Sequence, residues 1–228
     1  MSTFSGFPDS DAKFFKTLAK KNTREWFHAH KAEFETEWNA PMKALLGGLR
    51  ETIDASYARC DLGEPKVFRI NRDVRFSKDK APYKTHVGGL IPIARGGKGV
   101  TDVPMALYFQ VGAKDTFAGA GHYMMEKESL ERFRAAVADD KRGKELEKIL
   151  AALTKKGFTP RAYDRLKRAP KGYSPEHPRA ELLSYKGLTV MFPPIPKALL
   201  TSPKLAKWLA DACKVSAPFV DWLAIATA

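Results

Sequence analysis

Residues 66–86 read KVFRINRDVRFSKDKAPYKTH, and their pattern decides how the middle of the chain is interpreted. From Val67 to Phe76 apolar and polar residues alternate, and only Arg72 interrupts the apolar side. Successive side chains of a β-strand point to opposite faces of its sheet, so the alternation predicts a strand with one apolar and one polar face. Residues 77–85 are then expected to form a lysine-rich loop.

After this segment the chain continues as short apolar stretches separated by turn residues. Strands are predicted over residues 87–93, 105–111, 116–124 and 188–192. Residues 95–99 are expected to be a flexible connection, and residues 112–115 a turn. Consecutive strands joined in this way predict a mostly antiparallel, meandering sheet.

Both ends of the chain show helical periodicity instead. Apolar residues recur at helical spacing behind the candidate caps Asp9 and Thr23, and Pro41 suits the first turn of a third helix. Further helices are predicted around residues 130–137, 143–155, 180–185 and from 202, and Pro218 is expected to break the last of them. The fold class predicted is α+β, a mostly antiparallel sheet of meandering strands packed against N-terminal and C-terminal helices. Residues 1–228 are expected to form a single α+β domain, because no repeat or long linker interrupts them.

The chain is strongly basic, with a formal net charge of +13. Such a charge attracts nucleic acid, phosphate-bearing metabolites and anionic surfaces. Cys60 and Cys213 are too far apart in sequence to indicate a disulfide framework or a zinc site. The first residues lack the apolar core of a signal peptide, and no apolar run is long enough to cross a bilayer. We therefore expect a cytoplasmic protein with no membrane partner.

The basic segment is the candidate binding site. Arginines beside an acid and an amide can hold an anion bidentately, and the loop adds ammonium groups, an aromatic ring and a histidine that can exchange a proton. The predicted ligand-binding residues are Arg69, Asn71, Asp73, Arg75, Lys78, Lys80, Tyr83, Lys84 and His86. Arg72 lies on the apolar side, so a partner from elsewhere, such as a glutamate of the early helices, is expected to neutralise it.

Three functions are compatible with these residues. The first is binding of an anionic ligand that carries phosphate or carboxylate, with enzyme activity left open. The second is a nucleic-acid-binding module in which the same residues contact phosphates and Tyr83 or Phe76 stacks on a base. The third is a structural or interaction protein whose charges pair internally. A second basic run with two tyrosines either extends a basic groove or is a solvated surface; it contains Arg161, Arg165, Lys167, Arg168 and Lys171.

The sequence predicts no metal site, and it leaves both the catalytic residues and any cofactor open. It contains no metal-ligand spacing, P-loop, dinucleotide fingerprint or nucleophile elbow. Gly119 and Gly121, which precede His122, are expected to let a ligand or a neighbouring backbone approach closely. The oligomeric state is left open.

Several segments together resemble one protein family. They are NTREWF (22–27), FRINRDVRFSKDKAPYKTH (68–86), AGAGHYM (118–124), KRAPKGYSPEHPRAELLSYK (167–186) and APFVDWL (217–223). With these segments, nearly the whole chain resembles the bacterial and fungal family called domain of unknown function 2461. The resemblance implies a single α+β domain. It implies no catalytic residues, because the family carries no established activity.

Overall fold

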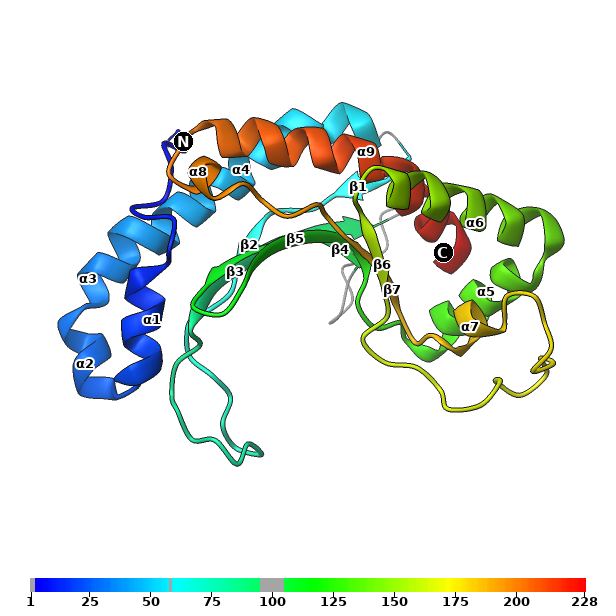
Figure 1. Ribbon diagram of the computed structural model, residues 1–228, viewed down its shortest axis with the longest axis horizontal. Helices are drawn as coiled ribbons and strands as arrows, with labels where there is room; N and C mark the ends of the chain where they lie inside the picture. Colours follow the sequence, from blue (N-terminus) through cyan, green and yellow to red (C-terminus); the bar gives the residue numbers. More distant parts are fainter. Residues whose placement is uncertain (1–2, 58, 95–104) are drawn as a thin grey trace.

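An antiparallel sheet is the centre of the computed structural model, which describes residues 3–57, 59–94 and 105–228 (Figure 1). Its strands are β1 (Asp61–Leu62), β2 (Lys66–Val67), β3 (His86–Ala94), β4 (Met105–Gly112), β5 (Thr116–His122), β6 (Thr159–Arg161) and β7 (Leu188–Met191). The spatial order is β1-β3-β4-β5-β7-β6, and β2 also pairs with β3. The predicted α+β fold and antiparallel meander are confirmed. The predicted connection at residues 95–99 lies outside the described residues.

One face of the sheet is buried under two long helices, α4 (Ala40–Ile53) and α9 (Lys204–Thr227). Alternate strand residues point towards these helices, and almost none of their surface is exposed; examples are Val87, Ile91, Leu107, Phe109, Val111, Ala118 and Ala120. Burial of each of the larger of these side chains stabilises the fold by about 1.5–3 kcal/mol. The hydrophobic core therefore lies between the sheet and α4 with α9.

Short helices at the N-terminus pack around aromatic side chains. They are α1 (Lys13–Lys20), α2 (Arg24–Ala29), α3 (Lys31–Glu33), the π-helical η1 (Phe34–Asn39) and, after α4, the 3₁₀-helical η2 (Asp54–Tyr57). The Thr23 side chain accepts a hydrogen bond from the backbone N–H of Trp26, as the predicted cap requires. Trp38 is fully buried, with its ring centroid 4.8 Å from that of Phe15 and 5.7 Å from that of Phe7. The early helices thus form an aromatic cluster at one end of the sheet.

The other end is covered by α5 (Lys127–Ala138), α6 (Asp140–Lys155) and α7 (Ala180–Ser184), and α8 (Lys197–Leu200) precedes α9. The prediction that Pro218 breaks the last helix is wrong, because α9 runs through it. A proline inside a helix costs about 3 kcal/mol. The side chains of Phe219, Val220 and Leu223 are fully buried beyond it, and their burial outweighs that cost.

The predicted strand from Val67 to Phe76 is mostly wrong. Only Lys66 and Val67 join the sheet, opposite Leu90 and Gly89 of β3. The following residues leave the sheet, because β3 begins only at His86. Beyond that point the segment that lies beside them is the second leg of the same loop, which leads back to β3. Pro82 in that segment has no N–H to donate, and a single isolated bridge joins the two legs.

Together these elements form an arch (Figure 1). The helices α4 and α9 follow its convex side, α1 to α3 stand at one end, and α5 to α7 stand at the other. The opposite, concave face of the sheet is not covered by a described helix. A search of the described helices finds none with the length and apolar character needed to cross a membrane.

Candidate functional site

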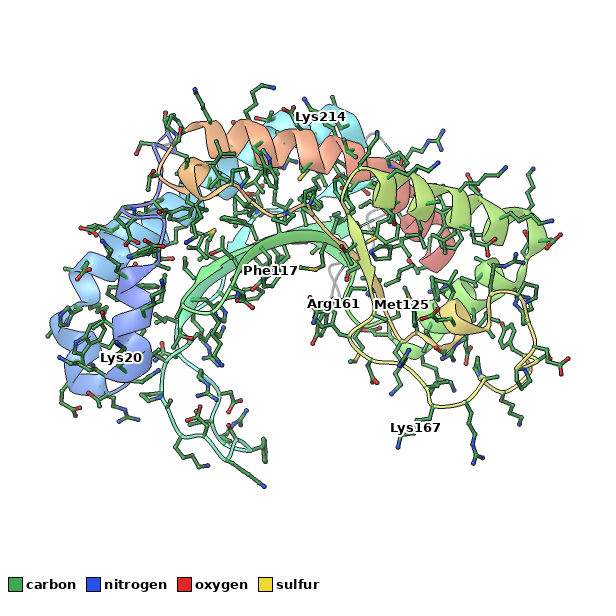
Figure 2. The ribbon with its side chains drawn as sticks, viewed as in Figure 1. Lys20, Phe117, Met125, Arg161, Lys167 and Lys214 are labelled. Carbon is green, nitrogen blue, oxygen red and sulfur yellow. The ribbon has the colours of Figure 1, made fainter. Side chains whose placement is uncertain are left out.

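Five aromatic side chains line a cavity of about 400 Å³ on the concave face of the sheet. These residues, here called the aromatic floor, are Phe68, Tyr108, Phe117, Tyr123 and Tyr163. Figure 2 shows Phe117 beneath the arched strands, on the side opposite α4 and α9. Cavities of this size and apolar character bind small molecules or parts of larger ones, and ring-lined walls favour flat groups.

The aromatic floor has two parts. Phe68, Tyr108 and Phe117 form a row in which neighbouring ring centroids lie 6.3 Å and 5.5 Å apart. Tyr123 and Tyr163 form a pair with centroids 4.6 Å apart. Phe68, Tyr123 and Tyr163 are 40%, 50% and 37% exposed, so a ligand can reach their rings.

Two glycines make this arrangement possible. A Cβ atom on Gly88 would lie 2.7 Å from the hydroxyl oxygen of Tyr108, so a side chain at position 88 would displace that hydroxyl. Gly121 has φ +131°, and a Cβ there would lie 2.4 Å from the carbonyl oxygen of Leu188. The expectation that glycine beside His122 lets a neighbouring backbone approach is confirmed. His122 itself is buried, and burial lowers its pKa to about 4.

A hydrogen-bonded chain follows one edge of the aromatic floor. The hydroxyl of Tyr108 donates to Oε1 of Gln110 over 2.7 Å, and Nε2 of Gln110 donates to Asp115. Burial, and secondarily Asp115, raises the pKa of Tyr108 far above its usual value. Burial and the neighbouring ammonium of Lys84 lower the pKa of half-buried His86, while Asp115 opposes them. At neutral pH the Tyr108 hydroxyl is therefore a neutral donor, and the ring of His86 is uncharged.

A projecting segment stands beside the aromatic floor. This basic arm, residues 68–85, extends from the sheet below β2 and β3 (Figure 1). Its base is anchored, because Ile70 and Tyr83 are buried and the Tyr83 ring stacks on Phe27 with centroids 4.2 Å apart. Asn22 binds the backbone N–H and carbonyl of Tyr83 with its side-chain amide. The arm is thus fixed to the N-terminal helices.

The two acids of the basic arm pair with its own arginines. Asp73 and Arg75 approach to 2.7 Å, and this guanidinium holds the pKa of the Asp73 carboxyl below its usual value. Arg72 lies 2.6 Å from Asp79 and also donates to the carbonyl oxygen of Ala81. The prediction that a glutamate of the early helices neutralises Arg72 is therefore wrong. The arm has six Lys or Arg residues against these two acids and remains net positive.

The predicted site residues are separated by this geometry. Arg69, Asn71, Asp73, Arg75, Lys78 and Lys80 are exposed along the basic arm rather than on a sheet face. Lys84 lies nearer the aromatic floor, with its ammonium 5.2 Å from the ring centroid of Phe68, and burial lowers its pKa. Tyr83 is 4% exposed and packs inward, so its predicted place in a ligand pocket is corrected to an anchoring role.

A second basic segment lies on the other side of the aromatic floor. We call residues 161–173 the basic loop; its exposed cations are Arg161, Arg165, Lys167, Arg168 and Lys171. The guanidinium of Arg161 lies 4.4 Å from the ring centroid of Tyr163, within cation–π distance. Figure 2 shows Arg161 beneath the sheet and Lys167 pointing away from the loop on the concave side. Residues of this loop also line a separate cavity of about 930 Å³ with α7.

Arg179 is an anchor that the sequence reasoning did not identify. Its side chain is 3% exposed, and its Nε donates to the carbonyl oxygen of Val137 over 2.7 Å. It also reaches carbonyl oxygens at the end of α5 and pairs with Asp140 and Glu147. The sequence signal was an arginine directly after a proline, within HPRAE at residues 177–181. Arg179 fixes the C-terminal end of the segment that carries the basic loop.

Comparison with known proteins identifies the family. Comparison with curated protein sequences gives no match. A family model described as "Conserved hypothetical protein (DUF2461)" matches residues 11–222. Because that match spans nearly all of the sequence, the chain belongs to the DUF2461 family.

Proposed function

We propose that the concave face binds single-stranded nucleic acid, with bases on the aromatic floor and phosphates on the basic arm and the basic loop. The observation that carries the proposal is the accessible row and pair of rings with cationic segments on both sides. Proteins that bind single strands combine ring platforms with a positive surface that follows the backbone.

The aromatic floor provides accessible rings on which bases can stack. Stacking of a base on an aromatic side chain contributes about 1–3 kcal/mol, and it tolerates any base because each has a π-face. Arg161, held over the Tyr163 ring, presents a planar guanidinium beside such a base. The row of Phe68, Tyr108 and Phe117 and the pair of Tyr123 and Tyr163 are separate groups of rings, so each would stack with a different base.

The charges favour a polyanion over internal pairing. The Asp73–Arg75 and Arg72–Asp79 pairs use both acids of the basic arm, and the arm remains net positive. The Asp73–Arg75 pair is exposed, and an exposed pair is worth at most about 1 kcal/mol, so a phosphate can replace Asp73 there. A purely structural role for the basic arm would not account for its excess positive charge.

A free nucleotide is the second candidate. The cavity of about 400 Å³ suits one base with its sugar, and Arg161 and Lys84 border it. This ligand also fits the prediction of a small phosphate-bearing molecule.

Fluorescence anisotropy with a labelled ten-base oligonucleotide tests the proposal. With four phosphate contacts, affinity should fall about fiftyfold between 50 and 200 mM salt. Phe117→Leu should lower affinity about tenfold through lost stacking. A protein that binds no oligonucleotide, or binds it without salt dependence, contradicts the proposal.

Two charge reversals form a matched comparison. Arg161→Glu, on the concave side, should weaken binding about tenfold or more, whereas Lys214→Glu, on the convex side, should have a small effect (Figure 2). Equal losses of affinity in the two variants would mean that binding depends on the net charge of the protein and not on the concave face. Competition with a mononucleotide separates the two candidates, because equal affinities for mononucleotide and oligonucleotide would favour the small ligand.

A further inference from the structure

The tip of the basic arm exposes a phenylalanine. Phe76 is 95% exposed, whereas the other exposed large apolar side chains in the described part of the chain are 37–50% exposed. The guanidinium of Arg75 lies 5.8 Å from the centroid of the Phe76 ring. Leaving such a ring in water forgoes about 1.5–3 kcal/mol of burial, which a partner could recover.

Polar cross-links hold this tip in shape. Arg72 joins Asp79, the Ala81 carbonyl and the hydroxyl of Ser77, so it ties the two sides of the tip together. The ammonium of Lys80 donates to the carbonyl oxygen of Val74 over 3.0 Å, and the N–H of Ser77 donates to the same carbonyl over 3.3 Å. Phe76 is thus held outward by hydrogen bonds around it, and binding need not order the tip first.

The position of the basic arm indicates which part of a bound nucleic acid the Phe76 ring would contact. The arm is anchored at its base through Tyr83 and extends on the concave side of the sheet. A strand lying on the aromatic floor would have its bases separated from one another, whereas bases in a duplex are stacked. A ring that projects beyond the floor, among cations, is suited to the place where stacked bases separate.

We propose that Phe76 is a wedge that inserts into the base stack where a single strand meets a duplex. This inference rests on the proposed function and names its substrate class, a duplex with a single-stranded tail. Apolar side chains inserted between bases cost a few kcal/mol of unstacking, which the added protein contacts offset. Arg75, whose guanidinium lies 5.8 Å from the ring centroid, and the exposed Lys78 and Lys80 a few residues along the tip can contact the phosphates on either side of the opened step.

The test compares two ligands and two kinds of variant. Affinities are measured for a ten-base strand and for a duplex that carries the same strand as a tail, with 2-aminopurine at the junction. Wild-type protein should prefer the tailed duplex about tenfold, the value of one stacking contact, and should raise the 2-aminopurine fluorescence as the base unstacks. Phe76→Ala should abolish both effects, and Phe76→Tyr should retain them. Ile225→Ala, which removes a 40% exposed apolar side chain on α9, should leave the preference intact.

Each alternative outcome has a clear meaning. Binding of the plain strand with no preference for the tailed duplex, or a preference that Phe76→Ala preserves, refutes the wedge and leaves the proposed function standing. Failure to bind either ligand refutes both proposals. Binding to vesicles containing anionic lipid that Phe76→Ala abolishes, with the duplex preference unchanged, would overturn the wedge and assign the tip to a membrane surface.

Discussion

Protonation of buried His122 should destabilise the folded chain at mildly acidic pH. The side chain is 7% exposed at the end of β5, and burial lowers its pKa from 6.5 to about 4, against the opposing effect of the Met124 backbone. Between these values the unfolded chain binds a proton that the folded chain does not. The free energy of unfolding therefore falls as pH decreases through this window, and the His122 contribution is fully present only above pH 6.5.

The size of the effect follows from the two pKa values. At about 1.4 kcal/mol per pKa unit, the full loss is about 3–4 kcal/mol, of which about 2–3 kcal/mol is lost between pH 7 and pH 4.5. Urea unfolding at both values measures it, and His122→Gln provides the comparison because glutamine does not titrate. The loss on acidification should be about 2–3 kcal/mol smaller in the variant, since the carboxylates and the other histidines contribute to both proteins.

Equal acid losses in the two proteins would refute this reasoning. If the variant does not fold, NMR titration of the His122 ring in the wild-type protein decides the matter. A midpoint near 6.5 would show that burial does not hold the ring neutral.

Three further substitutions test particular contacts. Tyr57→Phe removes the buried hydrogen bond of 2.7 Å to the Cys213 carbonyl and should lower the urea midpoint by the equivalent of about 1 kcal/mol with an unchanged slope; an unchanged midpoint would contradict it. Arg179→Ala leaves carbonyl groups at the end of α5 without their donor and should cost about 3 kcal/mol in unfolding experiments, with faster proteolysis of the basic loop; wild-type values would contradict the anchoring role. Gly88→Ala should cost about 1–3 kcal/mol through its clash with the Tyr108 hydroxyl, and adding Tyr108→Phe should recover part of that loss; additive effects in a double-mutant cycle would exclude the clash.

The helices and the central strands could be predicted because their periodicity reflects a single buried face. The strands β3, β4 and β5 each place alternate residues in the core, so sequence pattern and burial agree. The cap at Thr23 was predictable for a similar reason, because a hydroxyl at that position satisfies a free backbone N–H of its own helix. These features depend on contacts that a local pattern determines.

The basic arm and the aromatic floor depend on pairing that a local pattern does not reveal. Residues 67–76 alternate as a strand does, yet only Val67 joins β3 in the sheet, and a single isolated bridge joins Asn71 to Tyr83. The floor combines Phe68 with Tyr163, nearly a hundred residues later, and only the sheet order brings them to one face. The continuation of α9 through Pro218 depends likewise on distant burial partners.

The strand order has a consequence for how the chain assembles during synthesis. β6 lies outside β7, which the ribosome makes almost thirty residues later, so β6 has no neighbour to pair with until β7 emerges. The meander of β3, β4 and β5 can form earlier, but α9 must still arrive to complete its helical cover. The ring pair at Tyr123 and Tyr163 therefore depends on β7, and a nascent chain stopped before residue 188 would leave β5 with an open strand edge.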